Sequence, residues 1–298
     1  MAATRAVAAG NALGEGIVWD ARDQSLYWTD ITAATLWRHC PATDATRTWS
    51  LPEPLACLAL CEAEGWMLLG LATRLAFFHL ATGNIIPVCD VEPGMPTRIN
   101  DGACDREGRF VFGTKHEPAG GGPASPLGAF YRLDADLSLH RLALGRVAIA
   151  NGIAFSPDGR TLYYCDSPTR IIRCCSYTAG GEAFHPRDWV DLSELAGEPD
   201  GSTVDAEGGV WSAQWDAGRI ARYDARGCET RVIPLPVARP TRPALGGADL
   251  ATLFLTSAQP DNAVGARAQD GHVFAVPVDV PGLPEPRFAG TPPVASHH

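Results

Sequence analysis

Short apolar and polar runs alternate along most of the chain, and one arrangement of them recurs six times. Each copy starts with small or polar residues, continues into an apolar stretch, passes a turn and ends in a second stretch that is often aromatic. Residues i and i+2 share one face of a β-strand, so this pattern predicts paired strands. The copies span residues 14–31, 56–72, 98–114, 150–167, 200–215 and 243–258.

A third strand is predicted after each pair, and its turn-rich end leads outward to a fourth. The third strands fall within residues 35–43, 74–83, 129–136, 170–181, 219–227 and 272–282. Acidic-Gly pairs such as Asp158-Gly159 set the hairpins, and Asp105 and Asp205 stand at equivalent turns. No long window has helical periodicity. Each repeat therefore predicts a four-stranded antiparallel meander.

The spacing of the copies predicts how the sheets are assembled. We call the position at which the first strand of each copy begins its entry position. Entry positions recur at intervals of roughly 40 to 50 residues, which is typical of a propeller blade. Six sheets placed radially pack face to face and leave only short edges. We expect an all-β fold, a six-bladed β-propeller around a central channel, with residues 1–298 as one domain. Residues around Thr4 to Ala9 are expected to complete the last blade and close the ring.

Composition and charge limit the partners of such a fold. Hydrophobic residues make up 46% of the sequence and charged residues 19%, which is typical of a globular chain. No apolar run approaches the roughly 18 residues of a membrane-spanning helix. The net charge of −10 disfavours nucleic acid and favours a bound cation. We therefore expect neither nucleic acid nor a membrane as partner.

The amino terminus and the cysteines indicate the compartment. The first residues lack the apolar stretch of a secretory signal. The nine cysteines have no zinc-site spacing and are interpreted as reduced thiols, so we expect a cytoplasmic protein. Because a propeller closes its own edges, we expect a monomer. The final Ser296, His297 and His298 are interpreted as a tag remnant.

Candidate functional residues are found when the entry positions of the six copies are aligned. The innermost strand of each blade follows the channel, so these positions surround one mouth of it. They are Glu15, Ala56, Asn100, Asn151, Asp200 and Ala244, and four of them carry side-chain oxygens. Two carboxylates close together repel unless a proton or cation lies between them, and oxygen donors suit a hard divalent ion. We expect one divalent metal ion, Ca²⁺, Zn²⁺, Mn²⁺, Mg²⁺ or Fe²⁺; the alternative is that these side chains only cap turns.

Four ordered segments also carry a resemblance to a known family. They are LGEGIVWD with LYWTDI, TRINDGACDREGRFVFGT, ANGIAFSPDGRTLYYCDS and PDGSTVDAEGGVWSAQW. They resemble the motifs of the senescence marker protein (regucalcin)/gluconolactonase family over nearly the whole chain. The resemblance implies a six-bladed propeller with one divalent metal in the channel and hydrolysis of sugar-acid lactones.

The same resemblance implies roles for single residues. Glu15, Asn151 and Asp200 match the metal ligands, in agreement with the repeat alignment. Arg98 and Asn100 of the R-x-N-D motif match the groups that hold substrate oxygens, although Asn100 could equally contact the metal.

A departure from the family pattern follows the FGT triplet. The family often continues there with Met and two acidic residues, whereas this chain has Lys115, His116, Glu117 and Pro118. We assign Glu117 as a further substrate contact, and the sequence leaves the roles of Lys115 and His116 open.

These residues predict an enzyme. Lactone hydrolysis needs a polarised carbonyl, an attacking water and stabilisation of the oxyanion, and a channel-bound dication with one base can supply them. We predict an aldonolactonase of oxidative sugar catabolism, a carboxylic ester hydrolase with Asp200 as catalytic base and a small sugar lactone as substrate.

Two other functions remain open. One is a non-catalytic propeller that binds calcium or another ligand, since residues 27–30 read Tyr-Trp-Thr-Asp, a phrase of receptor propellers that here occurs once. The other is an organophosphate or aryl-ester hydrolase on a related propeller.

Overall fold

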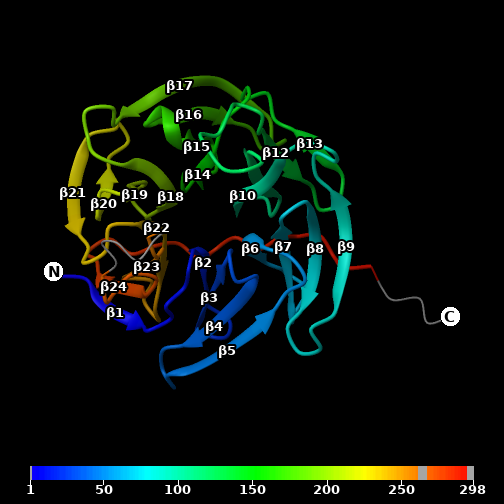
Figure 1. Ribbon diagram of the computed structural model, residues 1–298, viewed down its shortest axis with the longest axis horizontal. Coiled ribbons are helices and arrows are strands. Elements are labelled where there is room, and N and C mark those ends of the chain that lie inside the picture. The colour runs from blue at the N-terminus through cyan, green and yellow to red at the C-terminus, as the bar shows by residue number, and fades with distance from the viewer. Residues whose placement is uncertain (1, 261–266, 294–298) are drawn as a thin grey trace.

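The described part of the chain consists of six antiparallel sheets of four strands each. A computed structural model describes residues 2–260 and 267–293, so the C-terminal Ser296, His297 and His298 lie outside the described residues. The predicted all-β, six-bladed propeller is confirmed (Figure 1). We number its sheets as blades I to VI in chain order.

Blades I to III come from the first half of the chain. Blade I contains β2 (Gly14–Asp20), β3 (Ser25–Asp30), β4 (Thr35–Cys40) and β5 (Ala45–Ser50). Blade II contains β6 (Leu55–Leu60), β7 (Trp66–Leu71), β8 (Arg74–His79) and β9 (Ile85–Asp90). Blade III contains β10 (Thr97–Cys104), β11 (Phe110–His116), β12 (Phe130–Leu133) and β13 (Leu139–Arg141).

Blades IV to VI complete the ring. Blade IV contains β14 (Ala150–Phe155), β15 (Thr161–Asp166), β16 (Ile171–Tyr177) and β17 (Ala183–Asp191). Blade V contains β18 (Glu198–Val204), β19 (Val210–Trp215), β20 (Arg219–Tyr223) and β21 (Glu229–Pro234). Blade VI contains β22 (Pro240–Gly246), β23 (Thr252–Ser257), β24 (Val273–Pro277) and β1 (Thr4–Val7).

Blade VI joins the two ends of the chain. Strand β1 pairs antiparallel with β24, with Thr4 opposite Ala275 and Val7 opposite Val273. The expectation that the first residues complete the last blade is confirmed. Its outer strand thus comes from the opposite end of the sequence, which ties the ring shut without a covalent link.

The first strand of each blade lies at the centre of the ring, and the fourth lies at the periphery (Figure 1). Successive inner strands contact one another from β2 through β6, β10, β14 and β18 to β22, and β22 contacts β2 again. All six strands therefore begin near one end of a shared channel. Their first residues form the site described below.

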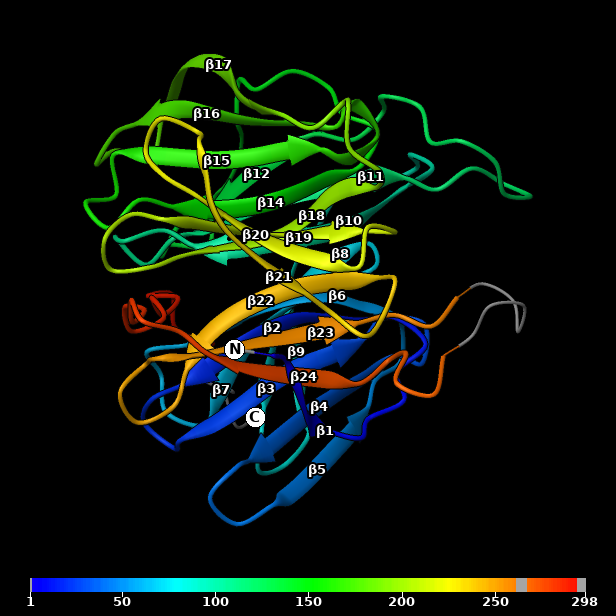
Figure 2. The ribbon, with the colours of Figure 1, turned by 90° about the vertical axis from the view of Figure 1, so that its left-hand side faces the viewer.

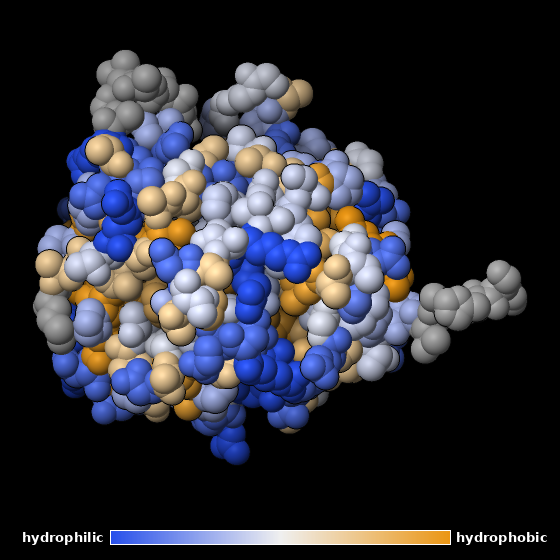
Figure 3. Space-filling model, turned by 90° about the horizontal axis from the view of Figure 1, so that it is seen from below, coloured by the Kyte–Doolittle hydropathy of each residue, from blue (hydrophilic) through white to orange (hydrophobic). Residues whose placement is uncertain are grey.

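Apolar side chains fill the spaces between blades. Between blades I and II, for example, Val18 and Tyr27 pack in one cluster with Leu58, Met67 and Phe78. All nine cysteines are free, as expected for reduced thiols. Apolar residues on the surface are scattered among hydrophilic ones (Figure 3).

Helical structure is confined, within the described residues, to the short 3₁₀ helix η1 (Ser167–Thr169). None of the described segments forms a helix with the length and apolarity needed to cross a membrane.

The two ends of the propeller differ. The segment between β11 and β12 projects from one end, whereas the C-terminal segment lies at the other (Figure 2). The C-terminal segment is hydrogen-bonded to several blades: Phe288 N–H donates to the Leu60 carbonyl (2.7 Å) and Ala289 N–H to the Gly108 carbonyl (2.8 Å). The Phe288 ring is fully buried. These contacts cover the end of the channel to which the inner strands run.

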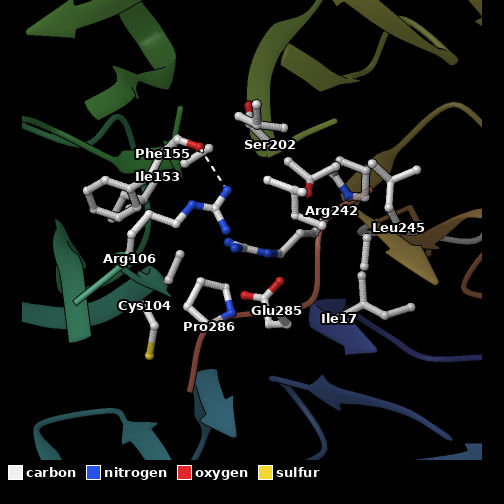
Figure 4. Close-up of a pocket in the computed structure, with 17 residues that line it drawn as sticks. Ile17, Cys104, Arg106, Ile153, Phe155, Ser202, Arg242, Leu245, Glu285 and Pro286 are labelled. Carbon is white, nitrogen blue, oxygen red and sulfur yellow. Dashed lines mark hydrogen bonds between the residues drawn. The ribbon is translucent and has the colours of Figure 1, made fainter. Parts of the chain in front are cut away.

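A small cavity of about 40 Å³ remains at this covered end. In it the guanidinium groups of Arg106 and Arg242 point toward each other, with Glu285 and Pro286 of the C-terminal segment beside them (Figure 4). The space accommodates about one water molecule and is too small for a sugar.

Candidate active site

Irregularities near the start of the inner strands turn selected side chains toward the channel. In β2, Glu15 pairs with Thr29 and regular pairing resumes only at Val18; in β14, Asn151 pairs with Cys165 and pairing resumes at Ala154. Such bulges re-aim a side chain within a strand.

Glycines make these bulges possible. Gly16 and Gly152, which follow Glu15 and Asn151, have φ angles of 59° and 67°, a left-handed conformation that L side chains rarely adopt. The glycine after Glu15 in the GEG motif and the glycine after Asn151 in the NG motif thus permit the backbone conformation that orients these two side chains.

A cavity of about 220 Å³ opens at this end of the channel. Its lining comes from blades I, III, IV and V and the segments that precede them. The lining residues are Leu13, Glu15, Ile31, Arg98, Asn100, Lys115, Ile149, Asn151, Ser167, Glu198, Pro199, Asp200 and Trp215. Of the six residues predicted for the site, five line one cavity; Glu117 is outside the lining and contacts Arg98 through a 3.3 Å ion pair.

Two carboxyl groups stand out electrostatically in this cavity. Burial raises the pKa of Glu15 to about 7, although the backbone N–H of Gly16 donates a hydrogen bond to it (3.0 Å). Burial and then the negative charge of Glu15 raise the pKa of Asp200 well above its ordinary value. The protein without a bound cation thus disfavours two charges at this point, the condition under which a cation or a proton binds.

An amide relay fixes Asn151. Its Nδ2 donates to Ser167 Oγ (2.9 Å), which donates to the Pro199 carbonyl (2.8 Å). Its Oδ1 accepts from Asn100 Nδ2 (2.9 Å), a group that also donates to the Ala150 carbonyl. Because both amide hydrogens of Asn100 and one of Asn151 have acceptors, the carbonyl oxygen of Asn151 is held toward Asn100.

Arg98 completes the polar wall. Its Nη1 donates to Asn100 Oδ1 (3.0 Å) and to the Ile99 carbonyl (2.8 Å), and its Nε faces Glu117 Oε1 at 3.3 Å. The guanidinium is buried, whereas 59% of the Glu117 side chain is exposed. Arg98 is therefore held by the protein on one side and borders the cavity on the other.

A buried ion pair joins opposite blades across the channel. Arg242 of blade VI pairs with Asp101 of blade III, which lies across the ring. Asp101 also accepts hydrogen bonds from the backbone N–H groups of Ile153 (2.9 Å) and Gly102 (2.8 Å). Arg242 borders the small cavity at the covered end, and neither residue of the pair lines the larger cavity.

The alignment of the sixth repeat was wrong. In β22, Pro240 faces Ser257 and pairing resumes with Pro243 opposite Leu255, so Thr241 and Arg242 occupy the bulge. Ala244 lies three residues beyond Thr241 and borders the small cavity instead. Like blade II, blade VI has no acidic-Gly or Asn-Gly pair at its bulge, so its alignment rested on the repeat pattern and spacing.

Besides Lys115, whose role the sequence left open, three polar or aromatic lining residues were not predicted as site residues. Ser167 directly follows β15, Glu198 begins β18 two residues before Asp200, and Trp215 ends β19 opposite Glu198. Trp215 is covered on one face by Arg239, whose guanidinium carbon lies 4.7 Å from the ring centre. Only the side-by-side arrangement of strand ends identifies these residues.

The oxygen donors of Glu15, Asn151 and Asp200 have the chemistry of a site for a hard metal ion. Within residues 2–260 and 267–293, no three or more His, Cys, Asp or Glu side chains are grouped so that they could hold one. The candidate set differs from such a group, because it contains two carboxylates and an amide oxygen. These are hard oxygen donors with two negative charges, and they fit a hard divalent cation.

Comparison with known proteins shows to which family the chain belongs. The model of the SMP-30/Gluconolactonase/LRE-like region matches residues 13–259. The chain belongs to this family. Within the family, an L-arabinolactonase of Azospirillum brasilense is 48% identical over 286 residues, which is 95% of this chain and 94% of that protein. A 6-deoxy-6-sulfogluconolactonase of Pseudomonas putida is 37% identical, over 93% of this chain and 95% of that protein.

A solved family structure has the same fold. The calcium-binding protein regucalcin from Agrobacterium tumefaciens superposes with a TM-score of 0.87 at 28% identity, over 94% of both chains. The family resemblance stated from the sequence motifs is thereby confirmed.

Proposed function

We propose that this protein is an aldonolactonase that depends on one divalent metal ion and opens a sugar-acid lactone to its aldonate. The observation that carries the proposal is the convergence of Glu15, Asn151 and Asp200 on one cavity beside Arg98 and Asn100. The lactonases among its relatives support the reaction class.

Glu15, Asn151 and Asp200 would hold the metal. When bound, a divalent cation supplies Lewis-acid polarisation of the lactone carbonyl. The regucalcin of similar structure is a calcium-binding protein, which supports a divalent cation without identifying the one used here.

Residues of the chain supply the catalytic base and the substrate contacts. Asp200 accepts a proton from the water that attacks the carbonyl carbon, as general base. Arg98 and Asn100 orient the sugar hydroxyls. Because Asn100 donates both amide hydrogens within the protein, a substrate hydroxyl would reach its Oδ1, beside Arg98. Glu117 acts at the outer side of the site, through its contact with Arg98.

The substrate class is a five- or six-carbon aldonolactone. A cavity of about 220 Å³ in which several charged and amide side chains stand beside apolar ones suits one sugar-sized ligand that carries several hydroxyls. The hydrogen-bonding side chains of Arg98 and Asn100 in this lining favour a hydroxyl-rich sugar lactone over an aryl ester or organophosphate.

The test is hydrolysis of gluconolactone, xylonolactone, arabinonolactone and fuconolactone, followed with a pH indicator and corrected for the spontaneous rate. Metal-stripped protein is compared with protein that has received single divalent ions. We expect little turnover without metal and restored turnover of at least one lactone with metal.

Substitution tests the assigned base. Asp200→Asn is expected to lower kcat by roughly 10²- to 10⁴-fold, the usual contribution of a general base. Asp188→Asn, on an exposed position of the outer strand β17, is the matched control and should leave kcat unchanged.

Two results would count against the proposal. Near-full turnover by metal-loaded Asp200→Asn would remove Asp200 as base. No turnover of any lactone by protein with confirmed metal binding would favour the non-catalytic binding propeller.

A further inference from the structure

Lys115 is unusual in this sequence because of its residue type. Of the 24 lysine and arginine residues in the sequence, it is the only lysine. All other cations are arginines, and this single lysine lines the candidate active-site cavity. Lysine and arginine differ physically, because an ammonium is a compact charge with three donors and a guanidinium is a wide planar fork.

The fold holds Lys115 beside the proposed reaction centre. It lies near the end of β11, directly opposite Arg98 of β10, and forms a bridge to Ile149, two residues before Asn151. The negative charge of Asp200 on β18 acts on its ammonium, as does that of Glu117 on its own strand end. Lys115 thus stands between blades III and IV and faces the carboxylate of blade V.

Its ammonium has donors to spare. Among the described residues, the Lys115 side chain takes part in no hydrogen bond and no salt bridge, although the residue is half-buried. By contrast, Arg98 donates to Ile99, Asn100 and Glu117, and Arg242 is paired with Asp101. Of these three cations, only Lys115 keeps all its side-chain donors for a ligand. Burial and the positive charge of Arg98 lower the pKa of Lys115 to about 8. The charged form of Lys115 is therefore less favourable here than in water.

We propose that the Lys115 ammonium contacts the reacting ester group of the lactone and donates a hydrogen bond to the oxygen atom on which negative charge develops. This inference rests on the lactonase function proposed above. It makes Lys115 a second catalytic residue beside Asp200.

The reaction balances without consuming Lys115. Water forms a bond from its oxygen to the carbonyl carbon while Asp200 takes one of its protons. The bond between this carbon and the ring oxygen then breaks, and the ring oxygen receives the proton. One water is consumed, the carboxylic acid that forms releases one proton to the solvent and becomes the aldonate, and Lys115 keeps its proton. Because its attraction to an oxyanion exceeds that to a neutral ester, it acts mainly on the transition state.

The first test is kinetic. Lys115→Met keeps the length and removes the charge; we expect kcat to fall roughly 10²- to 10³-fold, as for loss of an oxyanion donor, with KM within about threefold. Lys115→Arg should recover part of this loss. Arg187→Met, at an exposed position of outer strand β17, removes a cation away from the site and should leave kcat unchanged.

The second test uses the uniqueness of this lysine. Reductive methylation with ¹³C-formaldehyde labels Lys115 and the amino terminus only. On titration of the metal-loaded protein with arabinonate and gluconate, the hydrolysis products, we expect the Lys115 signal to shift and the terminal signal to stay. A purely structural lysine would not respond.

The outcomes separate the two proposals. If the unmodified enzyme hydrolyses a lactone and Lys115→Met keeps its kcat within threefold, the Lys115 inference is overturned and the lactonase stands. An unmoved Lys115 signal at saturating product also overturns it. If the unmodified protein hydrolyses no lactone with any ion, the lactonase proposal fails and the inference fails with it.

Discussion

At the scale of single residues, the site is a balance of buried charges. Glu15 and Asp200 carry raised pKa values because of burial. The arginines that act on Glu15 are already engaged, Arg98 with Glu117 and Asn100 and Arg242 with Asp101, and the Lys115 charge offsets the raised pKa of Asp200 only in part. The carboxylate charges are left for a ligand to neutralise. A divalent cation does so without the proton that would inactivate Asp200 as a base.

The buried charge of Glu15 predicts how the stability of the metal-free protein depends on pH. Glu15 has a pKa of about 7 when folded and 4.5 as its ordinary value, so folding favours its protonated form. Its contribution to stability is fully present below pH 4.5 and is lost as pH rises toward 7. We expect the free energy of unfolding of Glu15→Gln, relative to that of the unsubstituted protein, to increase over this range.

Urea unfolding at several pH values, with a chelator present, measures this difference. Glu194→Gln, on an exposed loop, is the control and should give a pH-independent difference. A Glu15→Gln difference that is equally flat from pH 4.5 to 7 would contradict the assigned burial of this charge.

Sequence motifs identified most of these residues for a local reason. Glu15 and Asn151 each precede a glycine that permits the bulge, and this signal is visible in the sequence. Ser167 and Glu198 carry no such signal, because their place depends on which strand ends lie side by side. Lys115 was noticed only as a departure from a family pattern, and its free donors could not be read from the sequence.

At the scale of elements, the inner-strand bulge is the unit that builds the site. It changes the register of each inner strand by one residue relative to its partner and thereby turns a side chain toward the channel. The strand predictions were correct because two-residue periodicity is local. The alignment failed in blade VI, where Thr241 and Arg242 occupy the bulge.

Gly152→Ala tests the bulge. An added Cβ would meet the Asp200 carbonyl and Cys165 Sγ at 3.2 Å, at a φ of 67°. Gly83→Ala, with a φ of 75° and open space around it, carries the backbone strain alone. We expect both to lose about 1 kcal/mol from that strain, and Gly152→Ala to bind divalent cations at least tenfold more weakly as well.

Urea unfolding and calorimetric titration of the metal measure the two effects. Equal metal affinity in both variants would show that the bulge glycine does not position Asn151.

At the scale of the whole molecule, the ring gives the channel two unlike ends. The C-terminal segment covers one end, the Arg242–Asp101 pair crosses the middle, and the larger cavity opens at the other end. The sequence predicted the number of blades and their closure by the first strand, because both follow from repeat spacing. It did not predict the cover, because the C-terminal segment follows the last repeat and contains no strand in its described part.

The most direct test of this account locates the metal. Crystals soaked in Mn²⁺ and measured at a wavelength where manganese scatters anomalously should give one strong peak in the larger cavity, within about 2.5 Å of oxygen atoms of Glu15, Asn151 and Asp200. The peak should vanish in Asp200→Ala. A peak elsewhere, or none at saturating Mn²⁺, would contradict the assignment of these three residues as the metal site.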